Sequence, residues 1–466
     1  MRRTPRIVAG ALALTLLAAA CGDDDPVAEV DPSQIADDDM ADDDMADDDM
    51  ADDDMADDDM ADDDMADDDM ADGPHTFRVT LTNTSGEFAI AASGAQAVAI
   101  DATEPGPALP GSGYEFTVPR SASNLSFATM FVQTNDWFWS AGPSGLALVD
   151  ADGNAVSGDV TDQVSLWDAG TEADQTPGEG ADQAPRQTGP DTGDADADST
   201  VRAVDGFDAA NYLAVTLTPN DDGSTTVRVD NISGDASVPG PIAPVAWAVH
   251  GADATFFTPG EAAPAGFEML AEDGGPSGVV EALAPVTGTA TPFAPVAWAV
   301  ADSSEVLFSR GGTASAGLEM LAEDGGPGGL VEELQAAGYE NSGAATNPDG
   351  GDEAGPAAPG STYSFEFTAD GGYLNLATMF VQSNDWFASL VDFPLYTDGA
   401  AASGDITDQL RLYDAGTETD QAIGAGPDQA PRQAGPDTGA VDADTEIRGL
   451  DTELGGHLTL TIEVVS

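Results

Sequence analysis

The chain has 466 residues with 12 Arg, no Lys and 86 Asp or Glu, which give a formal net charge of −74. This charge excludes a nucleic-acid-binding protein, because binding to phosphates requires clustered Lys and Arg. The lack of Lys excludes Schiff-base chemistry, and the single Cys excludes a disulfide framework or a cysteine-ligated zinc site. Gly-rich and β-branched stretches with few long helical periods predict an all-β fold.

Residues 1–20 have the organisation of a secretory signal peptide. The basic start Met1–Arg6 is followed by the apolar run Ile7–Ala20, which is too short for a permanent membrane span. The segment Leu17–Cys21 is similar to a bacterial lipobox, in which the Cys receives the lipid. We therefore predict export, lipidation of Cys21 and anchoring to the cell envelope with exposure at the surface. An ordinary signal peptide followed by a free Cys is the alternative.

Residues 21–73 form a strongly acidic segment. Seven copies of Ala-Asp-Asp-Asp-Met occupy residues 36–70, and residues 22–72 contain 27 acidic side chains and no basic one. Such a segment buries too little apolar surface to offset its ordering entropy, and its charges repel one another. We predict a disordered tether that holds a folded body away from the envelope. Diffuse buffering of Ca²⁺ by the repeated carboxylates is the alternative.

Two diverged copies of one unit follow the acidic segment. The sequence ATMFVQTNDWF at 128–138 recurs as ATMFVQSNDWF at 377–387, and both copies begin and end with alternating apolar residues. This period of two is typical of half-buried strands. We predict two antiparallel β-sandwich domains, a shortened first domain at 74–220 and a second at 221–466.

A shorter duplication lies within the predicted second domain. Residues 243–283 recur at 294–334, and apolar spacing with a Gly stop predicts a short helix near residues 317–325. The first domain has only a loose segment, 87–110, in the corresponding place. We call the two duplicated segments, 243–283 and 294–334, helical cassettes and assign both to the second domain. Whether the extra cassette packs on the first domain is left open.

Acidic residues follow two predicted strands in each copy. Asp136 comes after a buried run, and Asp168 and Glu172 lie in the turn that ends the next alternating run. Ca²⁺ binds several carboxylate and carbonyl oxygens in flexible geometry. If the two strand ends lie side by side, these carboxylates converge on one ion. The predicted ligands, for about one Ca²⁺ per domain, are Asp136, Asp168, Glu172, Asp385, Asp414 and Glu418.

The chain resembles the spondin N-terminal domain family, as found in bacterial envelope proteins. The resemblance rests on NDWF, on DAGTE about thirty residues later, and on the DQAPRQ and GPDTG segments, each present twice. It implies a sandwich similar to a C2 domain, with one Ca²⁺ held by the Asp before Trp-Phe, the Asp of DAGT and the acidic residue after that Thr. Animal members carry Asp where Glu172 and Glu418 stand, and they have cysteines that this chain lacks.

The resemblance also implies a role in adhesion or in recognition of an extracellular ligand, such as a glycan or another surface protein. We expect a non-catalytic calcium-binding protein, with no nucleic-acid partner and membrane contact only through its lipid. A passive structural or ion-buffering envelope protein is the alternative. A glycan hydrolase using Asp168 and Glu172 as paired carboxylates is a further alternative.

Overall fold

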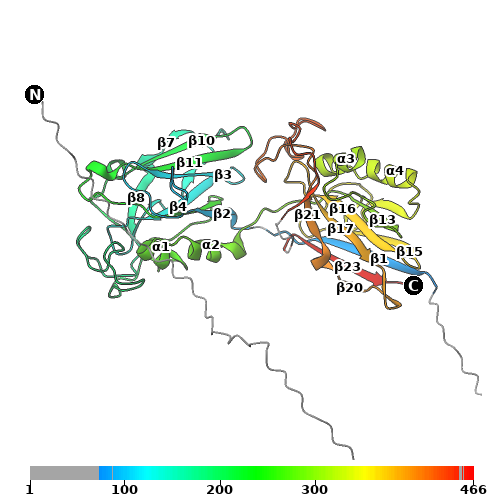
Figure 1. Cartoon of the computed structure of the whole chain (residues 1–466), viewed down its shortest axis with the longest axis horizontal. Coiled ribbons are helices and arrows are strands. Elements are labelled where there is room, and N and C mark those ends of the chain that lie inside the picture. The colour runs from blue at the N-terminus through cyan, green and yellow to red at the C-terminus, as the bar shows by residue number, and fades with distance from the viewer. Residues whose placement is uncertain (1–72, 87, 451–453, 455) are drawn as a thin grey trace, which may run out of the picture. The chain divides into compact units, whose positions relative to one another are not determined.

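The computed structural model describes residues 73–466 except 87, 451–453 and 455. The predicted signal peptide, Cys21 and the acidic tether therefore lie outside the described residues. The described chain consists mainly of antiparallel strands with four short α-helices, which confirms the all-β class (Figure 1). None of the described helices combines the length and the apolar character needed to span a bilayer.

One pair of sheets lies within residues 88–287, here called lobe 1. A four-stranded sheet in the order β3-β11-β10-β7 shares a core with a larger sheet in the order β2-β12-β4-β5-β8-β9, in which β6 pairs with β4. The strands are β2 Ile90–Gln96, β3 Gly113–Pro119, β4 Asn124–Met130, β5 Trp137–Ala141, β6 Leu146–Ala147, β7 Gly158–Asp159, β8 Val164–Asp168, β9 Arg202–Ala203, β10 Leu213–Pro219, β11 Ser224–Asn231 and β12 Val245–His250. The helices are α1 Phe267–Asp273 and α2 Ser277–Leu283.

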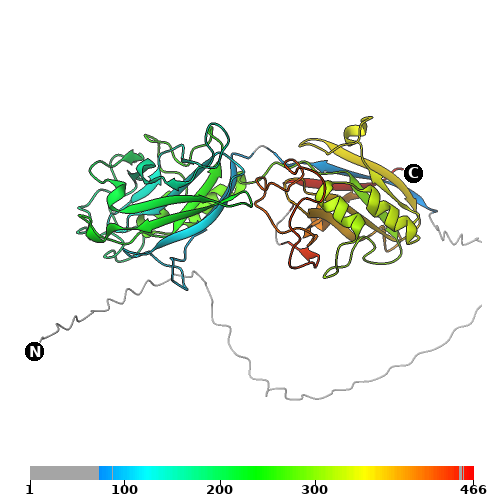
Figure 2. The same cartoon turned by 90° about the horizontal axis from the view of Figure 1, so that it is seen from above.

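A second pair of sheets lies within residues 75–86 and 288–466, here called lobe 2. Its sheets have the orders β15-β1-β23-β20 and β14-β13-β16-β17-β21-β22, and a small β18-β19 ladder is separate. The strands are β1 His75–Asn83, β13 Val296–Ala301, β14 Ser342–Ala345, β15 Thr362–Ala369, β16 Tyr373–Met379, β17 Trp386–Pro394, β18 Tyr396–Thr397, β19 Ala400–Ala401, β20 Gly404–Asp405, β21 Arg411–Asp414, β22 Arg448–Gly449 and β23 Leu458–Val464. The helices are α3 Ala316–Asp324 and α4 Gly328–Ala336, which lie against the larger sheet (Figure 2).

Buried and exposed side chains alternate along the strands, and the buried ones form the core of each lobe. In β1 the side chains of Phe77, Val79 and Leu81 are at most 1% exposed, while the residues between them are partly exposed. Successive side chains of a strand point to opposite faces, so these three enter the core that the two sheets of lobe 2 share. Burial of each such side chain contributes about 1.5–3 kcal/mol.

The predicted boundary at residue 220 is wrong, because the first strands of the two copies are exchanged. Strand β1 lies between β15 and β23 of lobe 2, whereas β11 lies between β3 and β10 of lobe 1. The two strands share one alternating pattern, and each lobe offers the same gap between two strands. The local sequence therefore fits either gap, and only the three-dimensional path of the chain selects one.

Each lobe contains one helical cassette, so the assignment of both cassettes to the second domain is also wrong. Strand β12 of the first cassette pairs with β2 and β4, and β13 of the second pairs with β14 and β16. The segment predicted to be loose contains strand β2. A Cβ at Gly94 would collide with the indole of Trp247, so glycine lets the indole lie against β2.

Candidate metal centre

The pairing of two strands brings the predicted acidic residues together at one end of each larger sheet. In lobe 1 the antiparallel register of β5 and β8 places Trp137 opposite Asp168, so the preceding Asp136 lies beside the end of β8. In lobe 2 Trp386 is opposite Asp414 in the same way. The expectation that the two strand ends lie side by side is confirmed in both copies.

Asp136 is fully buried, and only one of its two carboxylate oxygens accepts hydrogen bonds from the described residues. Its Oδ2 accepts hydrogen bonds from the backbone N–H of Thr171 at 2.8 Å, the Thr171 hydroxyl at 3.2 Å and the backbone N–H of Glu172 at 3.1 Å. Its Oδ1 has no partner among the described residues. Burial raises the pKa of Asp136 above its ordinary value, against the effect of the two N–H donors. An unpaired buried carboxylate oxygen is costly unless a cation or donor meets it.

Asp168 is held by a turn and by an arginine. Its Oδ1 accepts the backbone N–H of Gly170 at 2.7 Å, and its Oδ2 forms an ion pair with Arg202. Gly170 has a φ of 70°, and a Cβ there would lie 2.6 Å from the carbonyl oxygen of Thr200, so the turn requires glycine. Burial raises the pKa of Asp168 to about 7, the charge of Asp136 adds to this shift, and Arg202 opposes it.

The second lobe repeats the placement of these carboxylates, except that Asp385 Oδ1 accepts a hydrogen bond from the Asn384 side-chain amide at 3.4 Å. Asp385 Oδ2 accepts the backbone N–H groups of Thr417 and Glu418 at 2.9 and 3.1 Å. Asp414 pairs with Arg448 at 2.6 Å, and burial followed by the charge of Asp385 raises its pKa to about 7. Both copies of the repeated unit therefore bring the corresponding pair of buried carboxylates together.

The third member of each cluster was missed by the sequence analysis. Asp136, Asp168 and Asp174 each offer a carboxylate oxygen, and these oxygens lie within 4.8 Å of one another. Asp174 Oδ1 also accepts the Trp137 indole N–H at 2.7 Å, which fixes its position. The signal was present in the sequence, because an Asp follows the Glu of DAGTE by two residues in both copies. The corresponding cluster of lobe 2 is Asp385, Asp414 and Asp420.

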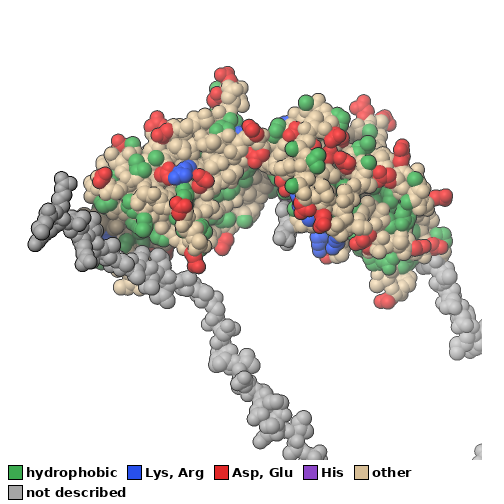
Figure 3. Space-filling model, turned by 45° about the horizontal axis from the view of Figure 1, so that its top comes forward, with side chains coloured by type: hydrophobic (Ala, Val, Ile, Leu, Met, Phe, Trp, Pro, Cys, Tyr) green, Lys and Arg blue, Asp and Glu red, His purple; other side chains and the backbone are tan. Residues whose placement is uncertain are grey.

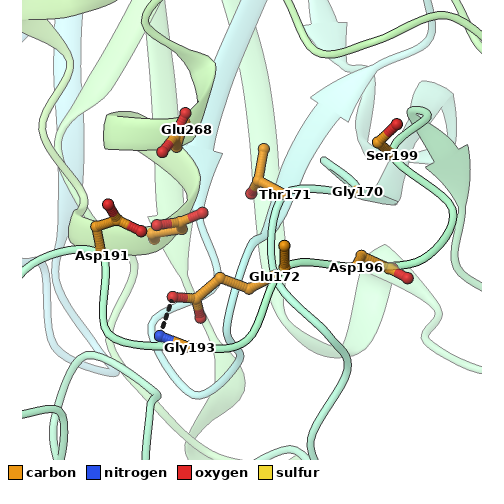
Figure 4. A pocket seen from close by; sticks show the side chains of 10 residues that line it. Gly170, Thr171, Glu172, Asp191, Gly193, Asp196, Ser199 and Glu268 are labelled. Atoms are coloured by element: carbon orange, nitrogen blue, oxygen red, sulfur yellow. Dashed lines mark hydrogen bonds between the residues drawn. The ribbon is translucent and has the colours of Figure 1, made fainter.

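Glu172, which was predicted as the third ligand, belongs to a different group. Its Oε1 accepts the backbone N–H of Gly193 at 2.7 Å, and its carboxylate is grouped with Asp191 and Glu272 (Figure 4). The backbone N–H of Glu172 faces Asp136, and the side chain extends to Gly193 instead.

Glu418 of lobe 2 departs from the predicted triad in the same way. It accepts the N–H of Gly439 at 2.7 Å, while its own N–H faces Asp385. In each lobe the structure thus places the two predicted Asp residues beside a further Asp, and the predicted Glu lies in a neighbouring group of carboxylates.

The donor set of the cluster Asp136, Asp168 and Asp174 fits a hard divalent cation. Three carboxylates in near contact repel one another, and Arg202 supplies a single positive charge against them. Oxygen-only ligands at such spacing suit Ca²⁺, which tolerates irregular geometry. The unpartnered Oδ1 of Asp136 provides a ligand atom that the protein itself leaves unused.

No protein-family model matches the chain, and no curated protein matches it either. The resemblance to spondin N-terminal domains therefore rests on the repeated motifs alone.

Proposed function

We propose that this protein is a non-catalytic, calcium-binding lipoprotein of the cell envelope, anchored through Cys21, that acts in adhesion or ligand recognition. Each lobe holds one structural Ca²⁺ at the strand ends, in a sandwich similar to a C2 domain. The proposal draws on the motif resemblance to spondin N-terminal domains and on the two equivalent carboxylate clusters.

The observation that carries the proposal is the state of Asp136. Asp136 is a fully buried carboxylate with one unpartnered oxygen, and one of its oxygens lies within 4.8 Å of oxygens of Asp168 and Asp174, which favours a bound cation. Because the chain has no Lys, the positive charge that neutralises these carboxylates must come from Arg or from a bound metal ion. The bound ion would neutralise the carboxylates and join the start of β5, the end of β8 and the turn after it.

The resulting rigid loops suit a recognition surface. Like charges in these loops repel one another, and a bound counter-ion would reduce that repulsion. Asp168, which the hydrolase alternative needs as an acid or base, is buried and ion-paired with Arg202, so it is poorly placed to reach a glycan. This environment favours binding over catalysis.

The surface charge limits the class of partner. Residues 73–466 contain 9 Arg and 59 acidic residues, a net charge of 9 − 59 = −50. Acidic side chains are spread over the visible face, with few Arg among them (Figure 3). Such a field repels polyanions and favours neutral glycans, basic surfaces or contacts bridged by divalent ions.

Calorimetric titration with Ca²⁺ and with Mg²⁺ tests the strand-end sites. We expect the variant Asp136→Asn with Asp385→Asn to lose one tight Ca²⁺ per lobe relative to the wild type. The variant Asp150→Asn with Asp398→Asn is the matched control, because both of these carboxylates are exposed and lie outside the clusters. Equal stoichiometry in the wild type and the cluster variant would contradict the proposed sites.

Binding to whole cells and to a glycan array tests the recognition role. We expect binding by the wild-type protein that a chelator abolishes and added Ca²⁺ restores. Ca²⁺ binding without any cell or glycan binding would favour the passive, ion-buffering alternative. Cleavage of glycosides that Asp168→Asn abolishes would instead favour the hydrolase.

A further inference from the structure

A second group of carboxylates connects the helical cassette of lobe 1 to two loops. Glu172 of the DAGTE turn, Asp191 of the GPDTG loop and Glu272 of α1 each offer an oxygen, all within 4.8 Å of one another. Figure 4 shows Glu172, Asp191 and Glu268 of α1 around the same pocket. None of these carboxylates belongs to the strand-end cluster.

Glu272 is buried and has a carboxylate oxygen without a hydrogen-bond partner among the described residues. The side chain is 2% exposed, and the oxygen concerned is Oε2. The described ion pairs include none to Glu172, Asp191 or Glu272, so no Arg neutralises them. Burial raises the pKa of Glu272 to about 7, a hydrogen bond with the Thr171 side chain opposes this shift, and the charge of Glu172 adds to it. A buried carboxylate with one unsatisfied oxygen among other carboxylates is disfavoured unless a cation or a proton neutralises it.

Lobe 2 contains the equivalent group on its own cassette. Glu319 and Glu323 of α3 offer oxygens within 4.8 Å of one from Asp437 of the second GPDTG loop. Glu418 lies close enough for its charge to raise the pKa of Glu323. Glu418 is 4% exposed, and its Oε2 also has no hydrogen-bond partner among the described residues. The unpartnered buried oxygen of this group in lobe 2 thus lies on Glu418, the counterpart of Glu172, and not on Glu323, the counterpart of Glu272.

The local structure leaves room for an ion and its water. The pocket has a volume of about 290 Å³, and its lining includes Glu172, Asp191, Glu268 and Glu272. Gly193 allows the Glu172 carboxylate to approach the backbone, because a Cβ at this position would overlap that carboxylate. Hard cations such as Ca²⁺ combine several carboxylate oxygens with water, and the pocket has carboxylates in its lining and room for water.

We propose that each lobe binds a second hard divalent cation of the Ca²⁺ class, which ties the helical cassette to the DAGTE and GPDTG loops. The ligands are Glu172, Asp191 and Glu272 in lobe 1, and Glu319, Glu323 and Asp437 in lobe 2 with Glu418 beside them. This site uses no carboxylate of the strand-end cluster, so it stands whether or not that cluster binds an ion.

Equilibrium dialysis of the full-length protein against about 1 mM Ca²⁺, a range typical of extracellular sites, tests the proposal. Salt at about 0.15 M weakens diffuse binding by the exposed charges, and the acidic repeats are identical in all variants. We expect Glu272→Gln with Glu323→Gln to lose one Ca²⁺ per lobe. The matched control is Glu281→Gln with Glu332→Gln, which removes the same charge from exposed positions on α2 and α4 and should retain all bound Ca²⁺.

A second variant protects the test against misfolding. Asp191→Asn with Asp437→Asn changes exposed loop residues, and it should lose the same ions while the circular dichroism stays unchanged. In the wild type, Ca²⁺ should slow hydrogen exchange in α1 and α3, and this effect should vanish in either variant. The strand-end variant Asp136→Asn with Asp385→Asn should keep these ions, which separates the two sites.

Wild-type stoichiometry in both cassette-site variants would overturn the proposal. A shared proton between two carboxyls is the competing way to satisfy Glu272. It predicts unchanged Ca²⁺ binding in these variants and no Ca²⁺-dependent protection of α1 or α3.

Discussion

The substitution Asp136→Asn separates the cost of a buried anion from the benefit of a bound ion. Asn keeps an oxygen to accept the N–H groups of Thr171 and Glu172, and it places a neutral NH₂ at the position of the unpartnered Oδ1. That NH₂ carries no charge, so it removes the repulsion between this side chain and the nearby carboxylates of Asp168 and Asp174. The variant should therefore remove the cost of the buried charge in the metal-free protein, and it should no longer bind the ion.

The two effects have opposite signs and similar size. Leaving a buried polar atom unsatisfied costs about 1–3 kcal/mol, so in chelator at pH 7 the variant should be more stable than the wild type by an amount in this range. A ligand present at 100 times its dissociation constant stabilises by about 2.7 kcal/mol, which the variant should forfeit in Ca²⁺. The stability of the variant relative to the wild type should therefore be lower in Ca²⁺ than in chelator by about 2.7 kcal/mol.

Native-state hydrogen exchange measures the local stability of each strand-end site in chelator and in Ca²⁺. The amides of Thr171 and Glu172 report on lobe 1, and those of Thr417 and Glu418 in the unaltered lobe 2 serve as an internal control. A bound ion at Asp136 is refuted if Asp136→Asn lowers the hydrogen-exchange protection of these amides equally in chelator and in Ca²⁺. That result would mean that the carboxylate acts only as a hydrogen-bond acceptor for the turn.

Two further predictions concern the turn glycines and pH. Gly193→Ala should cost about 1–3 kcal/mol of unfolding free energy in denaturant titrations, because its Cβ would overlap the Glu172 carboxylate; Gly189→Ala, with open space at its Cβ, should have little effect, and equal losses would count against the close approach. In chelator the melting temperature should fall as pH rises from about 4 to about 7, because the pKa values of Asp168 and Asp414 are raised to about 7 and the folded state favours their protonated forms. Added Ca²⁺ should raise the melting temperature more at pH 8 than at pH 5, and a pH-independent Ca²⁺ effect would contradict this assignment.

The sequence was sufficient for the fold class and for two of the three Asp residues in each strand-end cluster. Period-two alternation identified strands such as β1 and β23, because burial of one face requires that pattern wherever the strand pairs. The repeated NDWF and DAGT segments placed Asp136 and Asp168 at adjacent strand ends, because a sheet brings the ends of antiparallel neighbours together. These inferences depend only on local chemistry and on short-range order along the chain.

The tertiary structure alone decided which strand completes which sheet and which acid joins which cluster. Strands β1 and β11 have the same pattern, and β1 lies between β15 and β23 through contacts about 280 to 390 residues away along the chain, a choice that no local pattern encodes. Asp174 replaces Glu172 in the strand-end cluster because the Glu172 backbone, rather than its side chain, faces Asp136. The direction of a side chain in a turn depends on the loops packed around it, and here those loops are the GPDTG segment and the cassette helix.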